Sequence, residues 1–89
     1  MHVVVTTKHR GVFFGELDKD NGAVVKLRQA RNCVYWEAST HGFLGLAASG
    51  PGEGCRIGPA APSLTVRGVT AVAECSQEAV EAWEAEPWK

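Results

Sequence analysis

Cationic and aromatic side chains that could bind an anion are concentrated in two short segments, KHRG and QARNCVYW. The candidate residues in these segments are Lys8, His9, Arg10, Arg31, Asn32, Tyr35 and Trp36. An arginine can bind a phosphate or carboxylate and stack on a planar group, and an aromatic ring beside it can stack on a nucleobase. These residue types predict a site for a small anionic, nucleotide-like ligand. The alternative for KHRG is a solvated turn between two strands.

A third segment, GPGEGCRIGP at positions 50–59, could supply backbone donors to the same ligand. Gly50, Gly52 and Gly54 allow neighbouring N–H groups to converge on an anion, and Arg56 adds a positive charge. No Gly-Lys-Ser/Thr follows, so this is not a P-loop, and no βαβ unit surrounds it as a dinucleotide fingerprint requires. The alternative is a flexible or inter-subunit connection.

Alternation along QARNCVYW predicts two faces if the segment is a strand. Arg31, Cys33 and Tyr35 would share one face, with Val34 and Trp36 on the other. We expect Val34 and Trp36 to close the core, and Arg31 and Tyr35 to face the ligand. The alternative is that Cys33 and Tyr35 are buried beneath a partner subunit.

Catalytic and metal-binding signatures are not evident. Cys33 could be combined with His9 or His41, but no local motif supports a nucleophile–base pair. The three cysteines are widely spaced, and neither a CxxC nor an HxxxH pair occurs, which argues against disulfides and structural zinc. We therefore predict a protein that is not an enzyme, with no cofactor and no metal.

Length and charge limit the class of protein. A chain of 89 residues forms one domain, and a core this small is marginal without help, so we expect a homo-oligomer. Positions 1–67 carry eight Lys/Arg against five Asp/Glu, and positions 68–89 carry one against five. This distribution lacks the polybasic surface that binds duplex DNA. With no 18-residue apolar run and no signal-peptide core, the sequence predicts a cytoplasmic protein without a membrane partner.

The predicted fold is mainly β (α+β), in one domain over residues 1–89. Expected strands span 2–7, 11–17, 23–28 continuing or bending into 32–37, and 63–74 with a bulge at Gly68; Asn21-Gly22 forms a hairpin turn. Gly15 indicates a second bulge or a close backbone approach. A Gly/Pro-rich loop over 39–62 interrupts the β body of residues 1–75, and GFLGLAA within it is expected as a short helical turn or a strand anchored by Phe43, Leu44 and Leu46. The expected architecture is a small twisted antiparallel sheet or partial barrel with one C-terminal helix.

That helix is predicted over residues 76–86. Ser76 is a good N-cap, Glu78 suits the positive end of the helix dipole, and Val80 and Trp83 would dock it on the sheet. Its acidic residues most simply keep the protein soluble. The alternative is an intermolecular docking helix that uses Trp83 and Trp88.

The combination VVVTTKHRGVFFGEL, ARNCVYW, GFLGLAASGP, CRIGP and VTAVAECSQEAVEAW resembles a group of small proteins encoded by tailed phages and prophages. The resemblance implies an accessory protein in the bacterial host cytoplasm and supplies no catalytic residues. The predicted function is non-enzymatic binding of the nucleotide-like ligand, in one form the sequestration of a host defence signal. The alternatives are a single-stranded nucleic-acid binder, or a protein–protein inhibitor of a host enzyme.

Overall fold

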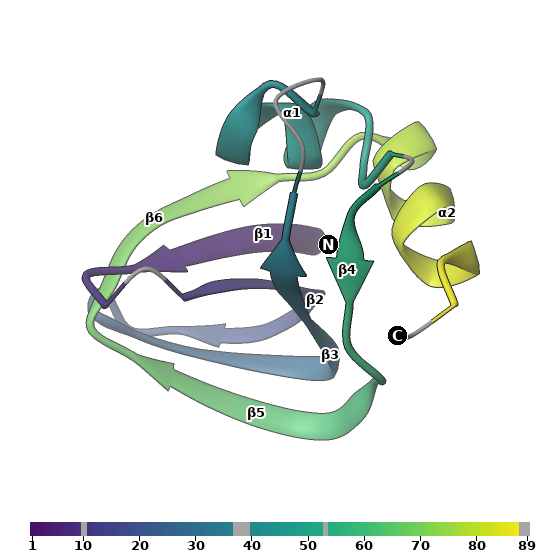
Figure 1. Ribbon diagram of the computed structural model, residues 1–89. Coiled ribbons are helices and arrows are strands. Elements are labelled where there is room, and N and C mark those ends of the chain that lie inside the picture. Colours follow the sequence, from purple (N-terminus) through teal and green to yellow (C-terminus); the bar gives the residue numbers. More distant parts are fainter. Residues whose placement is uncertain (10, 37–39, 53, 88–89) are drawn as a thin grey trace.

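The computed structural model describes residues 1–9, 11–36, 40–52 and 54–87, and within them it shows six strands and two helices (Figure 1). In chain order these are β1 (His2–Thr7), β2 (Val12–Asp20), β3 (Val24–Tyr35), α1 (Gly42–Ala48), β4 (Arg56–Ile57), β5 (Ala61–Arg67), β6 (Val69–Glu74) and α2 (Gln77–Ala85). The strands pair antiparallel in the order β4-β3-β2-β1-β6, and β5 also pairs with β3. The mainly β prediction is confirmed. The expectation of a single C-terminal helix is wrong, because α1 forms within the segment predicted as a loop.

The hairpin between β2 and β3 turns at Asn21 and Gly22, as predicted. The Asn21 N–H donates to the carbonyl of Val24 at 2.8 Å, and the Gly22 N–H donates to Oδ1 of Asp20 at 3.0 Å. Gly22 has a φ of 77°, which glycine adopts without steric cost. Asn-Gly therefore produces this turn through local backbone chemistry.

Strand β3 continues through both of its predicted segments and bends at a bulge. Gln29 at the bend has a φ of 50°, and the register with β2 shifts across Gly15, between Phe14 and Glu16. A Cβ at Gly15 would lie 3.0 Å from the Cβ of Leu27 and 3.1 Å from the carbonyl oxygen of Arg28. Gly15 thus permits the close backbone approach predicted for it. Glu37, the predicted end of the strand, lies outside the described residues.

Gly68 separates β5 from β6, and the strands on its two sides pair with different neighbours in the sheet. β5 pairs with β3, whereas β6 pairs with β1, so the sheet curls and brings distant strands together (Figure 1). Gly68 has a φ of 70°, and its carbonyl accepts the N–H of Lys8 at 3.0 Å. The interruption predicted at Gly68 is present, and it ends one strand and begins the next.

Two apolar clusters pack on opposite sides of β1. The inner core lies within the curl and contains Val3, Val5, Val25, Leu27, Ala30 and Val66. The helix core lies beneath α1 and α2 and contains Val4, Val12, Phe14, Cys33, Leu46, Ala47, Cys55, Ile57, Ala79, Val80 and Trp83. Because β1 is covered on both faces, its valines form an unbroken apolar run instead of alternating with polar residues.

Helix α2 begins as predicted. The hydroxyl of Ser76 accepts the N–H of Ala79 at 3.0 Å and donates to the carbonyl of Ala48 at 2.6 Å, which ties the N-cap to α1. Ala79, Val80 and Trp83 are buried, as expected of the docking face. Trp83 is 0 % exposed, so its proposed role in a docking surface is wrong. Trp88 lies outside the described residues.

Candidate functional site

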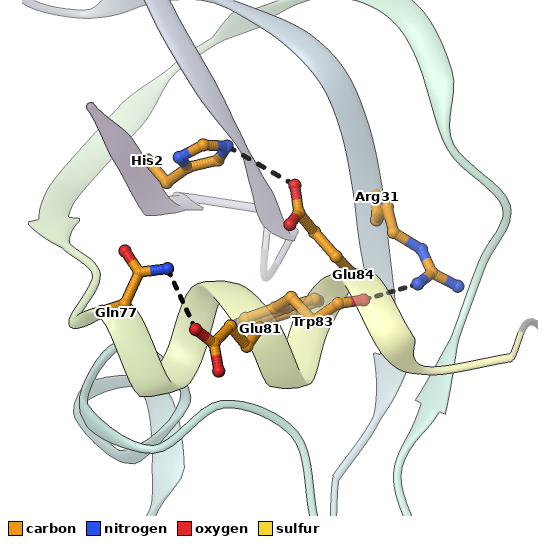
Figure 2. A network of polar contacts seen from close by, with 6 residues as sticks. All are labelled: His2, Arg31, Gln77, Glu81, Trp83 and Glu84. Carbon is orange, nitrogen blue, oxygen red and sulfur yellow. Dashed lines mark hydrogen bonds and ion pairs between the residues drawn. The ribbon is translucent and has the colours of Figure 1, made fainter.

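The residues predicted to form one site occupy separate parts of the fold. Lys8 and His9 lie in the β1–β2 turn, Tyr35 and Arg56 lie at the end of β3 and in β4, and Arg31 lies in β3 near the end of α2 (Figures 1 and 2). The β1–β2 turn and the end of β3 project in different directions (Figure 1). The fold therefore does not bring all of these residues together in a single ligand site.

Arg31 attaches α2 to the sheet. Its Nε donates to the carbonyl of Gly58 at 2.8 Å, and its Nη1 donates to the carbonyl of Trp83 at 2.6 Å (Figure 2). The residue is 8 % exposed, and burial lowers the pKa of its guanidinium against a smaller opposing effect of Glu86. Arginine nevertheless remains protonated. Arg31, which was predicted to contact the ligand, is thus mainly a buried structural residue.

The alternation predicted for QARNCVYW is present from Arg31 to Val34 and breaks at Tyr35, where the register with β4 shifts, and the assignment of its faces was partly wrong. Val34 is 63 % exposed, whereas Cys33 and Arg31 are buried. Trp36 is half-buried and packs against the helix core, as expected of a core residue. β4 and the helices cover the side of β3 that carries Arg31 and Cys33, and that coverage decides which face is buried.

An exposed cation–aromatic pair remains at the end of β3. Tyr35 lies opposite Arg56 in the β3–β4 pairing, and both residues are exposed. Asn32 is also exposed, and its carbonyl accepts the N–H of Gly58 at 2.8 Å. The adjoining hollow along Cys33–Trp36 has a volume of about 250 Å³. This volume falls below the usual range for ligand pockets, which makes the pair a weak candidate site.

Gly50 belongs to the predicted backbone nest of Gly50, Gly52 and Gly54. In the structure it is a packing residue. Gly50 is buried with a φ of 81°, and its N–H donates to the carbonyl of Leu46 at 3.1 Å. A Cβ at Gly50 would lie 2.6 Å from the Cβ of Ala82, so the missing side chain lets α2 approach. The Gly50 N–H therefore closes the end of α1 and is not free for an anion.

Gly50→Ala is expected to destabilise the protein by roughly 1–3 kcal/mol, because alanine is strained at positive φ and would overlap α2. Gly52→Ala is the matched control, since no described atom lies within 4 Å of a Cβ there and its φ is not left-handed. Its effect should stay within about 0.5 kcal/mol. Urea denaturation of both variants measures the difference; equal effects would contradict the packing role.

A basic groove opens between the β1–β2 turn and β5. It has a volume of about 350 Å³ and is lined by Thr7, His9, Gly11, Phe13 and residues 64–67. Phe13, Leu64 and Val66 supply its apolar surface, and all three belong to or pack against the inner core. The volume and the apolar lining are those of a small-ligand pocket.

A cationic side chain and an imidazole line this groove. His9 and Arg67 line it, while Lys8 is not among the lining residues and places its Cε 3.5 Å from where a Cβ on Gly68, the residue after Arg67, would lie. None of the described lining residues is a carboxylate. Arg10, the remaining cation predicted in this turn, lies outside the described residues. The groove can therefore attract an anion.

The turn that bears His9 is held in place by hydrogen bonds. The Gly11 N–H donates to Oγ1 of Thr7 at 3.0 Å, and the Thr7 N–H donates to the carbonyl of Gly11 at 3.0 Å. A Cβ at Gly11 would lie 2.8 Å from Cε2 of Phe13, so the glycine makes room for the ring. A fixed turn and a packed ring give the groove a preformed shape.

Sequence reasoning missed Phe13, Thr65 and Arg67 as lining residues. Arg67 directly precedes Gly68, and the predicted break there was the available signal that the chain changes direction. The pairing of β6 with β1 then brings Arg67 close to the β1–β2 turn. That pairing joins segments more than 60 residues apart, which alternation within one strand does not reveal.

Comparison with protein families matches residues 1–83 to a domain of unknown function, DUF6948. The chain belongs to this family. No curated protein and no solved structure matches the sequence. The DUF6948 match includes all of the residues that line the basic groove, and the family description names no ligand or reaction.

Two thiols of the DUF6948 domain are held in the protonated form. Burial raises the pKa of Cys33 to about 11, with a smaller contribution from Cys55, and burial raises that of Cys75 to about 11, with a smaller contribution from Glu74. A nucleophilic cysteine instead needs a lowered pKa. These environments do not favour thiolate catalysis.

We expect alkylation of Cys33 and Cys75 at pH 8 to be at least about 100-fold slower than that of a free thiol, since two pKa units remove that much thiolate. The same protein in denaturant is the control and should react at the ordinary rate. Mass spectrometry of iodoacetamide-treated protein measures each site.

The raised pKa values of Cys33 and Cys75 also make the free energy of unfolding depend on pH, because the folded state holds the two protons more tightly than the unfolded state. Their contribution to the free energy of unfolding is complete below about pH 9 and is lost as pH rises through about 11.

In the described part of the DUF6948 domain, no group of three or more His, Cys, Asp or Glu side chains is placed to hold a metal ion. Neither α1 nor α2 is long and apolar enough to cross a membrane, and no other helix occurs among the described residues.

Proposed function

We propose that this protein is a non-enzymatic binder of a small anionic ligand with a planar, nucleotide-like group, held in the basic groove. The observation that carries the proposal is the charge of the groove. Arg67, His9 and two threonine hydroxyl groups lie beside an apolar surface, and no described lining residue is a carboxylate. By contrast, a carboxylate-lined cleft would repel such a ligand.

Each part of the groove has a distinct role in this proposal. Phe13 offers a ring for the planar group, while Arg67 and Lys8 contact the phosphate or carboxylate. The hydroxyl groups of Thr7 and Thr65 provide hydrogen bonds that orient the ligand. His9 adds a donor, with a third positive charge when it is protonated. All of these are binding roles and need no covalent step.

The resemblance to phage and prophage proteins supplies the biological context of the proposal. A small viral protein that binds a nucleotide in the bacterial cytoplasm could sequester a signal made by a host defence system. A homo-oligomer would increase the number of grooves per particle. Both statements are part of the proposal and are tested with it.

The first experiment is native mass spectrometry of protein purified from bacteria, followed by denaturing extraction of any bound molecule. The expected result is a stoichiometric extra mass that leaves with the denatured fraction and absorbs in the ultraviolet. The same spectrum gives the oligomeric state. Protein without extra mass is then titrated with nucleoside mono-, di- and triphosphates and with cyclic nucleotides, and no saturable binding in that panel contradicts the proposal.

Arg67→Ala should weaken the affinity for the extracted or titrated nucleotide at least about tenfold, because a charge-assisted hydrogen bond contributes roughly 1.5–3 kcal/mol. Arg28→Ala is the matched control. Arg28 is also exposed and lies on a strand, but it pairs with Asp18 at 3.5 Å and does not line the groove. Isothermal titration calorimetry of both variants measures the difference. Equal affinities would remove Arg67 from the site.

The same titration distinguishes a single-stranded nucleic-acid binder. Its affinity would rise with oligonucleotide length and fall steeply with salt, whereas a groove for one nucleotide is indifferent to length. A length-dependent result would replace the small-ligand proposal.

A further inference from the structure

A second cleft lies on the opposite side of β3 from the inner core, at the end of α2. It has a volume of about 350 Å³, and its polar lining consists of His2, Gln29, Arg31, Glu84 and Glu86, with Phe14 among its apolar residues. These side chains come from β1, β2, β3, and from α2 and the residue that follows it (Figures 1 and 2). The cleft shares none of its lining with the basic groove.

Arg31 presents unused donors to this cleft. The residue is 8 % exposed and has five N–H groups, of which two donate to the carbonyls of Gly58 and Trp83. Within the described residues, the other three make no hydrogen bond, yet no side-chain nitrogen is both fully buried and unsatisfied. Figure 2 shows the second terminal nitrogen directed away from the Trp83 carbonyl. Since Arg31 lines the cleft, we expect a ligand there to bond to Nη2.

Among the residues that the structure describes, Arg31 has no direct counterion. Among the described residues, no carboxylate lies within 4.0 Å of its guanidinium nitrogens, although Glu86 is near enough to influence its pKa. Buried charges in proteins are generally paired, since removing them from water is costly. An anionic group bound to Nη2 would supply the counterion of this guanidinium.

The rim of the cleft carries the opposite charge. Glu84, near the end of α2, lies 3.8 Å from Nε2 of His2 (Figure 2). Glu86 directly follows the helix and also lines the cleft. A plain anion or a polyphosphate would meet two carboxylates here. A molecule with separate negative and positive groups would instead place one on Arg31 and the other beside the glutamates.

Two stacked rings, His2 and Phe14, line the cleft, and the buried Trp83 lies behind Phe14. His2 stacks on Phe14 with centroids 5.5 Å apart, and Phe14 stacks on Trp83 at 4.9 Å. We propose that this cleft binds a small zwitterion of the α-amino-acid class. Its carboxylate accepts hydrogen bonds from Arg31, its ammonium group lies beside Glu84 and Glu86, and its side chain packs against the His2–Phe14 wall.

Nitrogen-15 NMR titration of the full chain with each standard amino acid tests the proposal. At least one should give saturable shifts at the Arg31 Nε–H and at the amides of Gln29 and Ala60, with a Kd of about 1 mM or tighter. Its analogues without the ammonium group or without the carboxylate should bind at least about tenfold more weakly. If no amino acid gives saturable shifts up to about 10 mM, or if the analogues bind equally well, the proposal is overturned.

Variants of the rim show which groups bind the ligand and leave the buried Arg31 unchanged. Glu84→Gln and Glu86→Gln should each weaken amino-acid binding at least about threefold, while the affinity for the analogue without an ammonium group stays constant or rises. Glu81→Gln is the control, because Glu81 lies on α2 outside the cleft and interacts with Gln77 at 3.1 Å. Equal losses for Glu81→Gln would overturn the rim assignment. Arg67→Ala should leave this binding unchanged, so the two sites fail or succeed separately.

Discussion

Trp83→Ala is expected to lower the free energy of unfolding by roughly 3–5 kcal/mol. The side chain is 0 % exposed, stacks on Phe14 with the two rings 4° from parallel, and donates its indole N–H to the carbonyl of Leu46 at 3.0 Å. Alanine would leave a cavity at the centre of the helix core. In a domain of this size the loss corresponds to a fall in Tm of at least about 12 °C, measurable by circular dichroism.

Trp83→Phe separates the two contributions of the indole. Phenylalanine keeps an aromatic ring against Phe14, but it is smaller than the indole and removes one of the two donors of the Leu46 carbonyl, which keeps the Gly50 N–H. We expect a loss of roughly 1–3 kcal/mol, clearly smaller than that of alanine. A loss below about 1 kcal/mol for Trp83→Ala would contradict the position of Trp83 in the core.

Arg31→Met is the second substitution with a large expected effect, roughly 2–4 kcal/mol. In a continuing helix the Trp83 carbonyl would accept the N–H of residue 87, but Pro87 has none, so Arg31 supplies the donor. Methionine retains much of the apolar stem while leaving the carbonyls of Gly58 and Trp83 unpaired. Denaturant unfolding measures the loss, and hydrogen exchange should show that the last turn of α2 opens more often.

Arg28→Met is the control for Arg31, three residues away on the same strand. Arg28 is exposed, and its ion pair with Asp18 is at the surface, where such pairs contribute roughly 0–1 kcal/mol. Arg31→Lys adds a further comparison, since one ammonium group cannot match two carbonyls in the geometry of a guanidinium. If Arg31→Met and Arg28→Met cost the same, Arg31 does not hold α2 to the sheet.

The two arginines look alike in the sequence and differ entirely in the fold. Both lie in β3 and both fit a prediction of surface charge. Arg31 becomes buried because β4 and α2 cover its side of the strand, and because two carbonyls without other partners are within its reach. The direction of alternation was predictable, whereas the side that would be covered depended on segments 27 and 52 residues away.

The sequence alone determined the features that depend on local backbone chemistry. The Asn21-Gly22 turn, the Ser76 cap and the interruption at Gly68 each follow from what one or two residues permit their own backbone to do. The tertiary structure decided what lies beside what. Pairing of β6 with β1 and β5 with β3 formed the basic groove, and docking of α2 made Gly50 a packing residue. Such contacts depend on the combined burial of distant segments, and no single stretch of residues encodes that burial.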